Sequence, residues 1–152
     1  TYRSEFVKAH NRPAPPPVVI DVTYCNNDAG KAEEMARKYI SSYYLSVLEH
    51  YEFLEDYHRD MKGYEAYAGA VDILKAAGKE QSLEDYVNVQ AYGTPQQILD
   101  KLEKRREVVG DFEWSVMMSY AGMPHDEVEK SMRLFGKEVL PEVKSWGVET
   151  AA

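Results

Sequence analysis

The sequence predicts an α/β chain in which two buried strands are each followed by helices. Residues 18–24 and 112–119 are apolar runs rich in β-branched or large apolar side chains, which is the pattern of a buried strand. Elsewhere apolar residues recur every three to four positions, the spacing of one face of an amphipathic helix. Strands that alternate with helices are typical of parallel α/β structure, although two strands cannot close a sheet or barrel alone.

The first strand is predicted to lie between a connector and a long helix. Residues 1–17 end in a proline-rich run that lacks backbone donors and prefers an extended path, so they are interpreted as a connector. Residues 26–28 supply turn and N-cap side chains for a helix from residue 28 to about residue 54. Its expected apolar face consists of Ala32, Met35, Ala36, Tyr39, Ile40, Tyr43, Val47 and Tyr51.

Glycines interrupt the middle of the chain, where shorter helices are expected over residues 64–77 and 82–90. A sharper boundary follows at residues 93–97. Thr94 suits an N-cap, Pro95 suits the first helical position, and Gln97 completes a capping box. This helix is expected to end at Gly110, because glycine commonly occupies the left-handed position after a helix.

The second strand, residues 112–119, is expected to lead into a final helix through the turn at residues 120–124. Val128, Met132 and Phe135 lie on one face of that helix, which continues toward Leu140. Pro141 is expected to kink or end it.

Composition restricts the classes of partner. The chain has 152 residues, a net charge of −8 and a pI near 5.0, so it lacks the clustered cations that nucleic acid or anionic lipid would require. Its longest apolar run falls far short of the ~20 residues that span a bilayer. Cys25 is the single cysteine, which excludes an internal disulfide and makes a reducing, cytoplasmic location the expectation.

Several short motifs occur in a family-specific order. They are Tyr-Gly-Thr-Pro-Gln-Gln-Ile at residues 92–98, Gly-Met-Pro at residues 122–124, and Ser-Met-Arg-Leu-Phe-Gly-Lys-Glu-Val-Leu-Pro at residues 131–141. Residues 50–53 and 62–67 add two further motifs upstream. Together they resemble the C-terminal end of bacterial-luciferase-like, flavin-dependent monooxygenases.

The resemblance implies a fold that is incomplete in this chain. Residues 18–146 would form the C-terminal part of a (β/α)8 TIM barrel, with strands seven and eight separated by a helical insertion at about residues 53–92 and followed by a tail at residues 147–152. About six preceding βα units would be absent, because such a barrel needs ~250 residues.

The resemblance also implies an activity. The chain would be a C-terminal fragment or subunit of a monooxygenase that uses reduced FMN and O2 on an organic substrate, without a metal. Its partners would be the remaining N-terminal half of the barrel or a companion chain, a second copy in a dimer, and a flavin reductase. A non-catalytic half-barrel that has lost flavin binding and a deazaflavin-dependent oxidoreductase are the alternatives.

Candidate pocket residues follow the two predicted strands, because TIM barrels place functional side chains at the carboxyl ends of strands. They are Tyr24, Tyr120, Gly122 and Met123, with His50 and Tyr51 from the inserted segment expected over the same mouth. A tyrosine at a strand end is also commonly a packed residue with a paired hydroxyl. The catalytic and flavin-contacting residues stay unassigned.

Three other patterns have a structural explanation. Glu49, His50, Glu52, Glu55 and His58 lack the spacing of a metal motif and suit a solvated helix face. The turn before Pro95 lacks the glycines and lysine of a phosphate loop and suits a helix cap. Cys25 has no identifiable histidine partner, so a packed thiol is favoured over a nucleophile.

Overall fold

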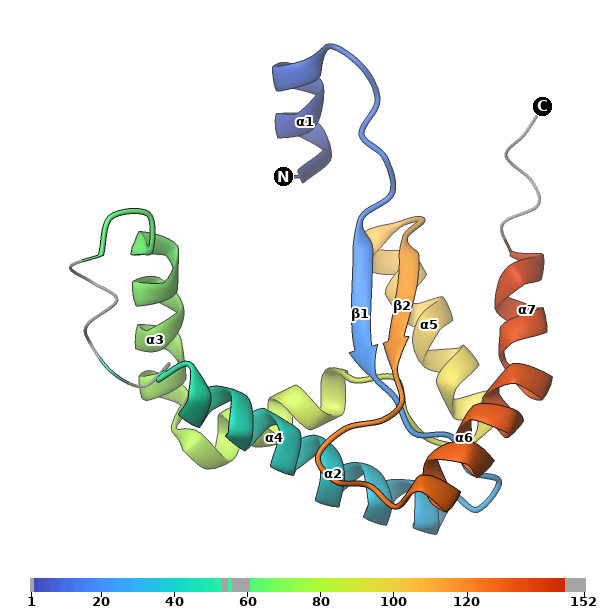
Figure 1. Cartoon of the computed structure of the whole chain (residues 1–152). Coiled ribbons are helices and arrows are strands. Elements are labelled where there is room, and N and C mark those ends of the chain that lie inside the picture. The colour runs from blue at the N-terminus through green and yellow to red at the C-terminus, as the bar shows by residue number, and fades with distance from the viewer. Residues whose placement is uncertain (1, 53–54, 56–60, 147–152) are drawn as a thin grey trace.

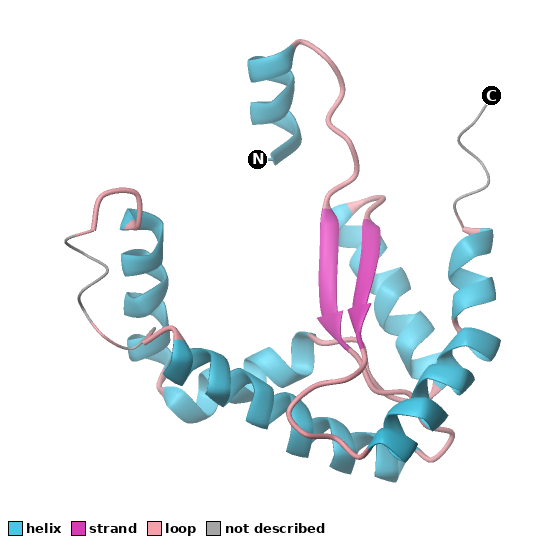
Figure 2. Ribbon diagram, in the orientation of Figure 1, coloured by secondary structure: helices cyan, strands magenta, loops and turns pink. Residues whose placement is uncertain are grey.

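A computed structural model describes residues 2–52, 55 and 61–146, which contain seven helices and two strands (Figures 1 and 2). The elements in chain order are α1 (Tyr2–His10), β1 (Val18–Val22), α2 (Ala29–His50), α3 (Glu65–Ala77), α4 (Lys79–Val89), α5 (Pro95–Val109), β2 (Glu113–Met117), α6 (His125–Glu138) and α7 (Leu140–Ser145). No helix in these ranges is long and apolar enough to cross a membrane.

Both predicted strands are present, and they pair in parallel from Val18 opposite Glu113 to Val22 opposite Met117. Their carboxyl ends therefore point the same way, toward α2 and α6 (Figure 1). The capping box at the start of α5 is also confirmed. The Thr94 hydroxyl accepts from the Gln97 backbone N–H at 3.3 Å, and the Gln97 side chain accepts from the Thr94 N–H at 2.9 Å.

The prediction of a TIM-barrel segment is wrong. Across the described ranges the sheet has two strands of five residues each, and helices contain most of the chain. Helices α2, α3 and α4 extend away from the sheet as one helical arm (Figure 2). This arm uses its apolar faces for helix–helix packing, with Tyr44 of α2 stacked on Tyr86 of α4 at 4.4 Å between ring centroids. The chain is thus a mainly helical protein with a small parallel sheet.

The two faces of the sheet differ in burial. On one face Trp114 packs on Phe135 of α6, with ring centroids 5.5 Å apart, and Leu102 of α5 belongs to the same core cluster. On the other face the side chains of Val18 and Ile20 are 60% and 68% exposed. Strands of parallel sheets are ordinarily covered on both faces. In the described part of the chain, the face that carries Val18 and Ile20 is open at the start of β1.

A buried ion pair fixes β1 to α5. Asp21 is 2% exposed, and its carboxylate accepts two hydrogen bonds from the Arg105 guanidinium, at 2.5 and 3.0 Å. Trp114 Nε1 and the backbone N–H of Ala91 donate to the same carboxylate at 2.6 and 3.1 Å. Four hydrogen bonds therefore compensate one buried charge, as burial of a carboxylate requires.

The chain leaves the end of β1 and returns beside the same point after the helical arm. The Gly93 N–H donates to the Tyr24 carbonyl at 3.0 Å, and the Asn26 N–H donates to the Gly93 carbonyl at 3.1 Å. Nearby, the buried Val22 N–H donates to Gln90 Oε1 at 2.9 Å. Gly93 has φ +136°, and an added Cβ would lie 2.7 Å from Gln97 Oε1, so this crossing point requires glycine.

The segment interpreted as a connector contains helix α1, and the chain from Pro13 to Pro17 is irregular. No residue of α1 is buried. In Figure 1 the helix stands apart from the other elements, at the amino-terminal end of the strands.

Candidate functional site

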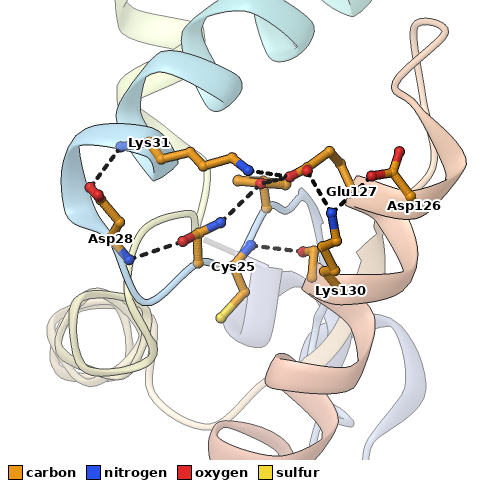
Figure 3. A network of polar contacts seen from close by, with 9 residues as sticks. Cys25, Asp28, Lys31, Asp126, Glu127 and Lys130 are labelled. Carbon is orange, nitrogen blue, oxygen red and sulfur yellow. Dashed lines mark hydrogen bonds and ion pairs between the residues drawn. The ribbon is translucent and has the colours of Figure 1, made fainter.

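The candidate site lies at the carboxyl ends of the two strands, where residues 23–26 and 118–124 meet the first turns of α2 and α6 (Figure 3). Asp28 caps α2, because its side chain accepts from the Lys31 N–H at 3.0 Å. Asn26 orients that cap by accepting from the Asp28 N–H at 2.9 Å. These turn and cap hydrogen bonds therefore fix the direction in which α2 leaves the site.

Glu127, in the first turn of α6, is the centre of the polar network (Figure 3). The Tyr24 hydroxyl donates to Glu127 Oε2 at 2.8 Å, and Lys31 Nζ lies 2.8 Å from the same oxygen. Lys130 Nζ bonds to Glu127 Oε1 at 3.1 Å and to Asp126 at 2.8 Å. One carboxylate thus links the end of β1, the start of α2 and the start of α6.

The surroundings hold Tyr24 and Glu127 in opposite protonation states at neutral pH. Hydrogen bonds from Lys31, Tyr24 and Lys130 lower the pKa of Glu127 to about 2, so it is ionised. Burial, above all, raises the pKa of Tyr24 to about 12, so the phenol keeps its proton. The pair is a charge-assisted hydrogen bond with a fixed direction.

Tyr120 follows β2 and has an unusual hydroxyl. The residue is 7% exposed, and its hydroxyl oxygen is buried without a hydrogen-bond partner in the described part of the chain. Its ring makes an edge-on contact with Tyr43 of α2, at 6.3 Å between centroids. Burial beside Tyr24 and Tyr86 raises the pKa of Tyr120 far above its usual range.

Gly122 and Met123 line a surface pocket of about 350 Å³ formed by residues 119–125. Met123 is 5% exposed and belongs to the core cluster that contains Tyr24 and Tyr120. Gly122 has φ +71°, and an added Cβ would meet no atom within 4 Å, so its role is to permit the turn. Four predicted pocket residues thus come together at the strand ends.

His50 and Tyr51 are not part of this group. They lie at the far end of α2, which has 22 residues and therefore carries them about 30 Å from its first turn. Both are exposed, and their rings contact each other edge-on at 5.0 Å. The expectation that they lie over the same mouth is not met.

Cys25 is a packed residue, as its structural explanation predicts. Cys25 is 1% exposed, and burial raises the pKa of its thiol to about 12, which leaves no thiolate for nucleophilic attack. Its backbone N–H donates to Ser131 Oγ at 2.8 Å. No group of three or more potential metal ligands occurs in the described ranges, and His58 lies outside them.

Sequence reasoning missed the charged members of the network, which are Lys31, Asp126, Glu127 and Lys130. The sequence could have indicated Asp126, Glu127 and Lys130, because acidic residues four and three positions before a lysine lie on the same helix face as that lysine. The contact of that face with Tyr24, 103 positions away, has no local signal.

The polar network at the strand ends is poorly suited to hold the phosphate of FMN. Both nearby lysines are paired with carboxylates, and Asp126 and Glu127 place negative charge at the start of α6, where an anion would otherwise be attracted. The α2 N-terminus is already capped by Asp28. What the site does offer is a rigid wall with one ionised carboxylate, one fixed phenol and a small pocket.

Comparison with solved structures shows a likeness of fold. No protein-family model matches the chain, and no curated protein matches it. The crystal structure of monooxygenase RslO1 from Streptomyces bottropensis matches 91% of this chain with a TM-score of 0.53 and 17% sequence identity. The match covers 35% of that protein, so this chain spans about a third of its length. At this identity the likeness shows the fold alone, and the luciferase-like family stays a prediction.

Proposed function

We propose that this chain is part of a monooxygenase and forms one wall of its substrate pocket. The observation that supports the proposal most is the match to monooxygenase RslO1 over 91% of this chain. The position of the polar network adds to it, because ligands of parallel α/β proteins bind outside the carboxyl ends of the strands. The pocket beside Met123 lies at that end.

The finer part of the proposal is that the complete enzyme uses reduced FMN and O2 on an organic substrate. Because Lys31 and Lys130 are already paired, the FMN phosphate would be held by residues outside this polar network. We therefore assign no catalytic step to this chain. Its own residues would position the pocket wall, through the fixed bond from Tyr24 to Glu127.

This role requires further polypeptide, either in a longer form of this chain or in a companion chain. Val18 and Ile20 are more than half exposed on the open face of the sheet, where a covering layer would bury them. The solved monooxygenase is about three times as long as the matched region, which agrees with further polypeptide around this fold. Burial of the exposed two thirds of these side chains would contribute about 1–2 kcal/mol each.

The experiment is to purify the chain from its native source under mild conditions, then measure the intact masses and the absorption spectrum. We expect a flavin band together with either a second polypeptide or a chain mass well above 17.4 kDa. A deazaflavin spectrum would correct the cofactor. A lone folded 17.4-kDa chain without any flavin would overturn the proposal and favour a non-catalytic binding protein.

A matched pair of variants tests the pocket. Met123→Ala removes a buried side chain from the pocket wall, whereas Met132→Ala removes a side chain that is 53% exposed on α6. In the purified complex we expect Met123→Ala to change the Michaelis constant for the substrate and Met132→Ala to leave it unchanged. Equal behaviour of the two variants would contradict the placement of the pocket.

A further inference from the structure

His125 is the first residue of α6 and lines the pocket beside Met123. The residue is exposed, and in the described part of the chain its imidazole takes part in no hydrogen bond, ion pair or ring contact. The other titratable side chain of this pocket is Tyr120, whose buried hydroxyl keeps its proton because burial raises its pKa far above the usual range. Histidine ordinarily gains or loses a proton near neutral pH. His125 is therefore open to a ligand and able to change its charge.

A tight turn shapes the pocket. The Met123 N–H donates to the Tyr120 carbonyl at 3.0 Å, and the two residues between them have φ values of +49° for Ala121 and +71° for Gly122. Alanine rarely adopts this left-handed conformation, and residues strained in this way concentrate at functional sites. Both ends of the turn are held in the core, since Tyr120 is 7% exposed and Met123 is 5% exposed. The shape of the pocket is thus set by the chain itself.

The charges around the start of α6 stay constant between pH 5 and pH 8. The ionisable groups there are Tyr24, Lys31, Asp126, Glu127, Glu129, Lys130 and Arg133. Hydrogen bonds, above all that from Lys31, lower the pKa of Glu127 to about 2 (Figure 3). The bond between Asp126 and Lys130 lowers the pKa of the carboxyl and raises the pKa of the amine. A change in ligand binding across this pH window would therefore report on the imidazole.

The lining of the pocket favours a neutral aromatic ligand. Ala121, Met123 and Pro124 provide apolar surface, and a volume of about 350 Å³ suits a single substituted ring. A carboxylate or phosphate would compete with Asp126 and Glu127 for both nearby lysines. A neutral imidazole has one nitrogen that accepts a hydrogen bond. A phenolic hydroxyl is the matching donor, since it is more acidic than an aliphatic alcohol and is uncharged at neutral pH.

We propose that His125 selects substrates that carry a phenolic hydroxyl, which donates a hydrogen bond to the neutral imidazole while the aromatic ring lies against Met123. This role rests on the proposed function, in which the pocket takes the substrate of a monooxygenase. His125 acts in it by binding alone, without making or breaking a covalent bond. Protonation turns the acceptor nitrogen of the imidazole into a donor, so phenol binding should weaken as the pH falls through the range in which histidine is protonated.

Nuclear magnetic resonance of the 152-residue chain at pH 8 tests the site with two probes of similar shape, phenol and anisole. Anisole has a methyl ether in place of the hydroxyl and cannot donate a hydrogen bond. We expect phenol to shift the imidazole signals of His125 with a roughly millimolar dissociation constant, and to bind roughly fivefold more tightly than anisole. The signals of His10 and His50, on α1 and at the far end of α2, should not move. Equal binding of the two probes, or no shift at His125, would overturn the proposal.

Two substitutions separate the acceptor from the charge. His125→Leu removes the acceptor, so phenol and anisole should bind alike. His125→Gln keeps an acceptor oxygen that is not protonated in this pH range, so the preference for phenol should remain and lose its pH dependence. In the parent chain the preference should disappear between pH 8 and pH 5. His50→Leu is the matched control and should change nothing, since His50 is exposed at the other end of α2. A preference for phenol that persists in His125→Leu would refute the assignment.

Phenol binding requires neither flavin nor further polypeptide, so failure of this assignment can be distinguished from failure of the proposed function. A chain that prefers phenol but is purified without flavin retains the hydroxyl site and loses the monooxygenase assignment. A flavin-containing complex whose chain binds phenol and anisole equally shows the reverse. Benzoate, a carboxylate of similar size, is the third probe. Tighter binding of benzoate than of phenol at pH 8 would identify an anion site and refute the selection of phenols.

Discussion

Replacement of Arg105 by methionine should destabilise the chain far more than the same change at Arg106. Arg105 is 13% exposed and provides two of the four hydrogen bonds to the Asp21 carboxylate, whereas Arg106 is 44% exposed and pairs with Asp111 at the surface. Loss of one partner of a buried ion pair typically costs about 3–5 kcal/mol, and an exposed pair contributes at most about 1 kcal/mol.

The structure places the cost of Arg105→Met at the lower end of that range, about 3 kcal/mol. Trp114 Nε1 and the Ala91 N–H still donate to Asp21 in this variant, so the carboxylate is not left entirely without donors. For a chain of this length the melting temperature should fall by roughly 6–12 °C. Arg106→Met should melt within a few degrees of the parent chain.

Urea unfolding followed by far-ultraviolet circular dichroism measures this difference without relying on Trp114, which touches the network. The double variant Asp21→Asn with Arg105→Met should be more stable than Arg105→Met alone, because it no longer buries an unpaired charge. If Arg105→Met does not fold, Arg105→Lys provides a milder step. Equal costs at positions 105 and 106 would refute the reasoning.

Four further predictions concern the strand ends and the helix cap. Glu127 has a pKa of about 2 in the folded chain, below its usual value of 4.5, so its stabilisation is complete above pH 4.5 and is lost as the pH falls toward 2. Between pH 7 and pH 3 the free energy of unfolding, measured by urea titration, should therefore fall less for Glu127→Gln than for the parent chain. Tyr24→Phe should cost about 1.5–3 kcal/mol, since it removes a bond to a charged group, and the same urea assay should find Tyr120→Phe neutral or stabilising, since its hydroxyl has no partner in the described residues. Equal costs for these two variants would contradict the network. Cys25 should not react with a thiol reagent at pH 8 until denaturant is added, and rapid labelling of the folded chain would show that it is accessible. Thr94→Ala should cost about 1 kcal/mol in thermal or urea unfolding through loss of the N-cap of α5, and Thr94→Ser should restore most of it.

Local chemistry predicted the elements well. The cap at Thr94 and Gln97, the end of α5 before Gly110 and the two apolar strands all depend on residues within a few positions, and all are present. The break after α6 was also anticipated from Pro141, although it occurs just before that residue, where Val139 separates α6 from α7. Helix α1 was missed because the proline run beside it dominated the interpretation of residues 1–17.

Longer-range arrangement was less predictable. The barrel prediction failed because a resemblance in short motifs says nothing about how many strands accompany them, and the sheet here has two in the described ranges. Tyr24, Tyr120 and Met123 were grouped correctly because carboxyl ends of parallel strands meet at one edge. His50 and Tyr51 were misplaced because the course of α2 beyond its first turns depends on packing with α4, which no short motif records.

The crossing at Gly93 has a consequence for how this chain can change in evolution. The helical arm lies between Asn26 and Gly93, and these two residues are joined by a backbone hydrogen bond of 3.1 Å. The intervening polypeptide is therefore a closed loop whose entrance and exit coincide, and the entropy of closing such a loop grows only slowly with its length. Insertions or deletions within residues 51–78 would leave the paired ends of β1 and β2 in register. Descendants of this chain can thus differ greatly in size while retaining the same strand ends.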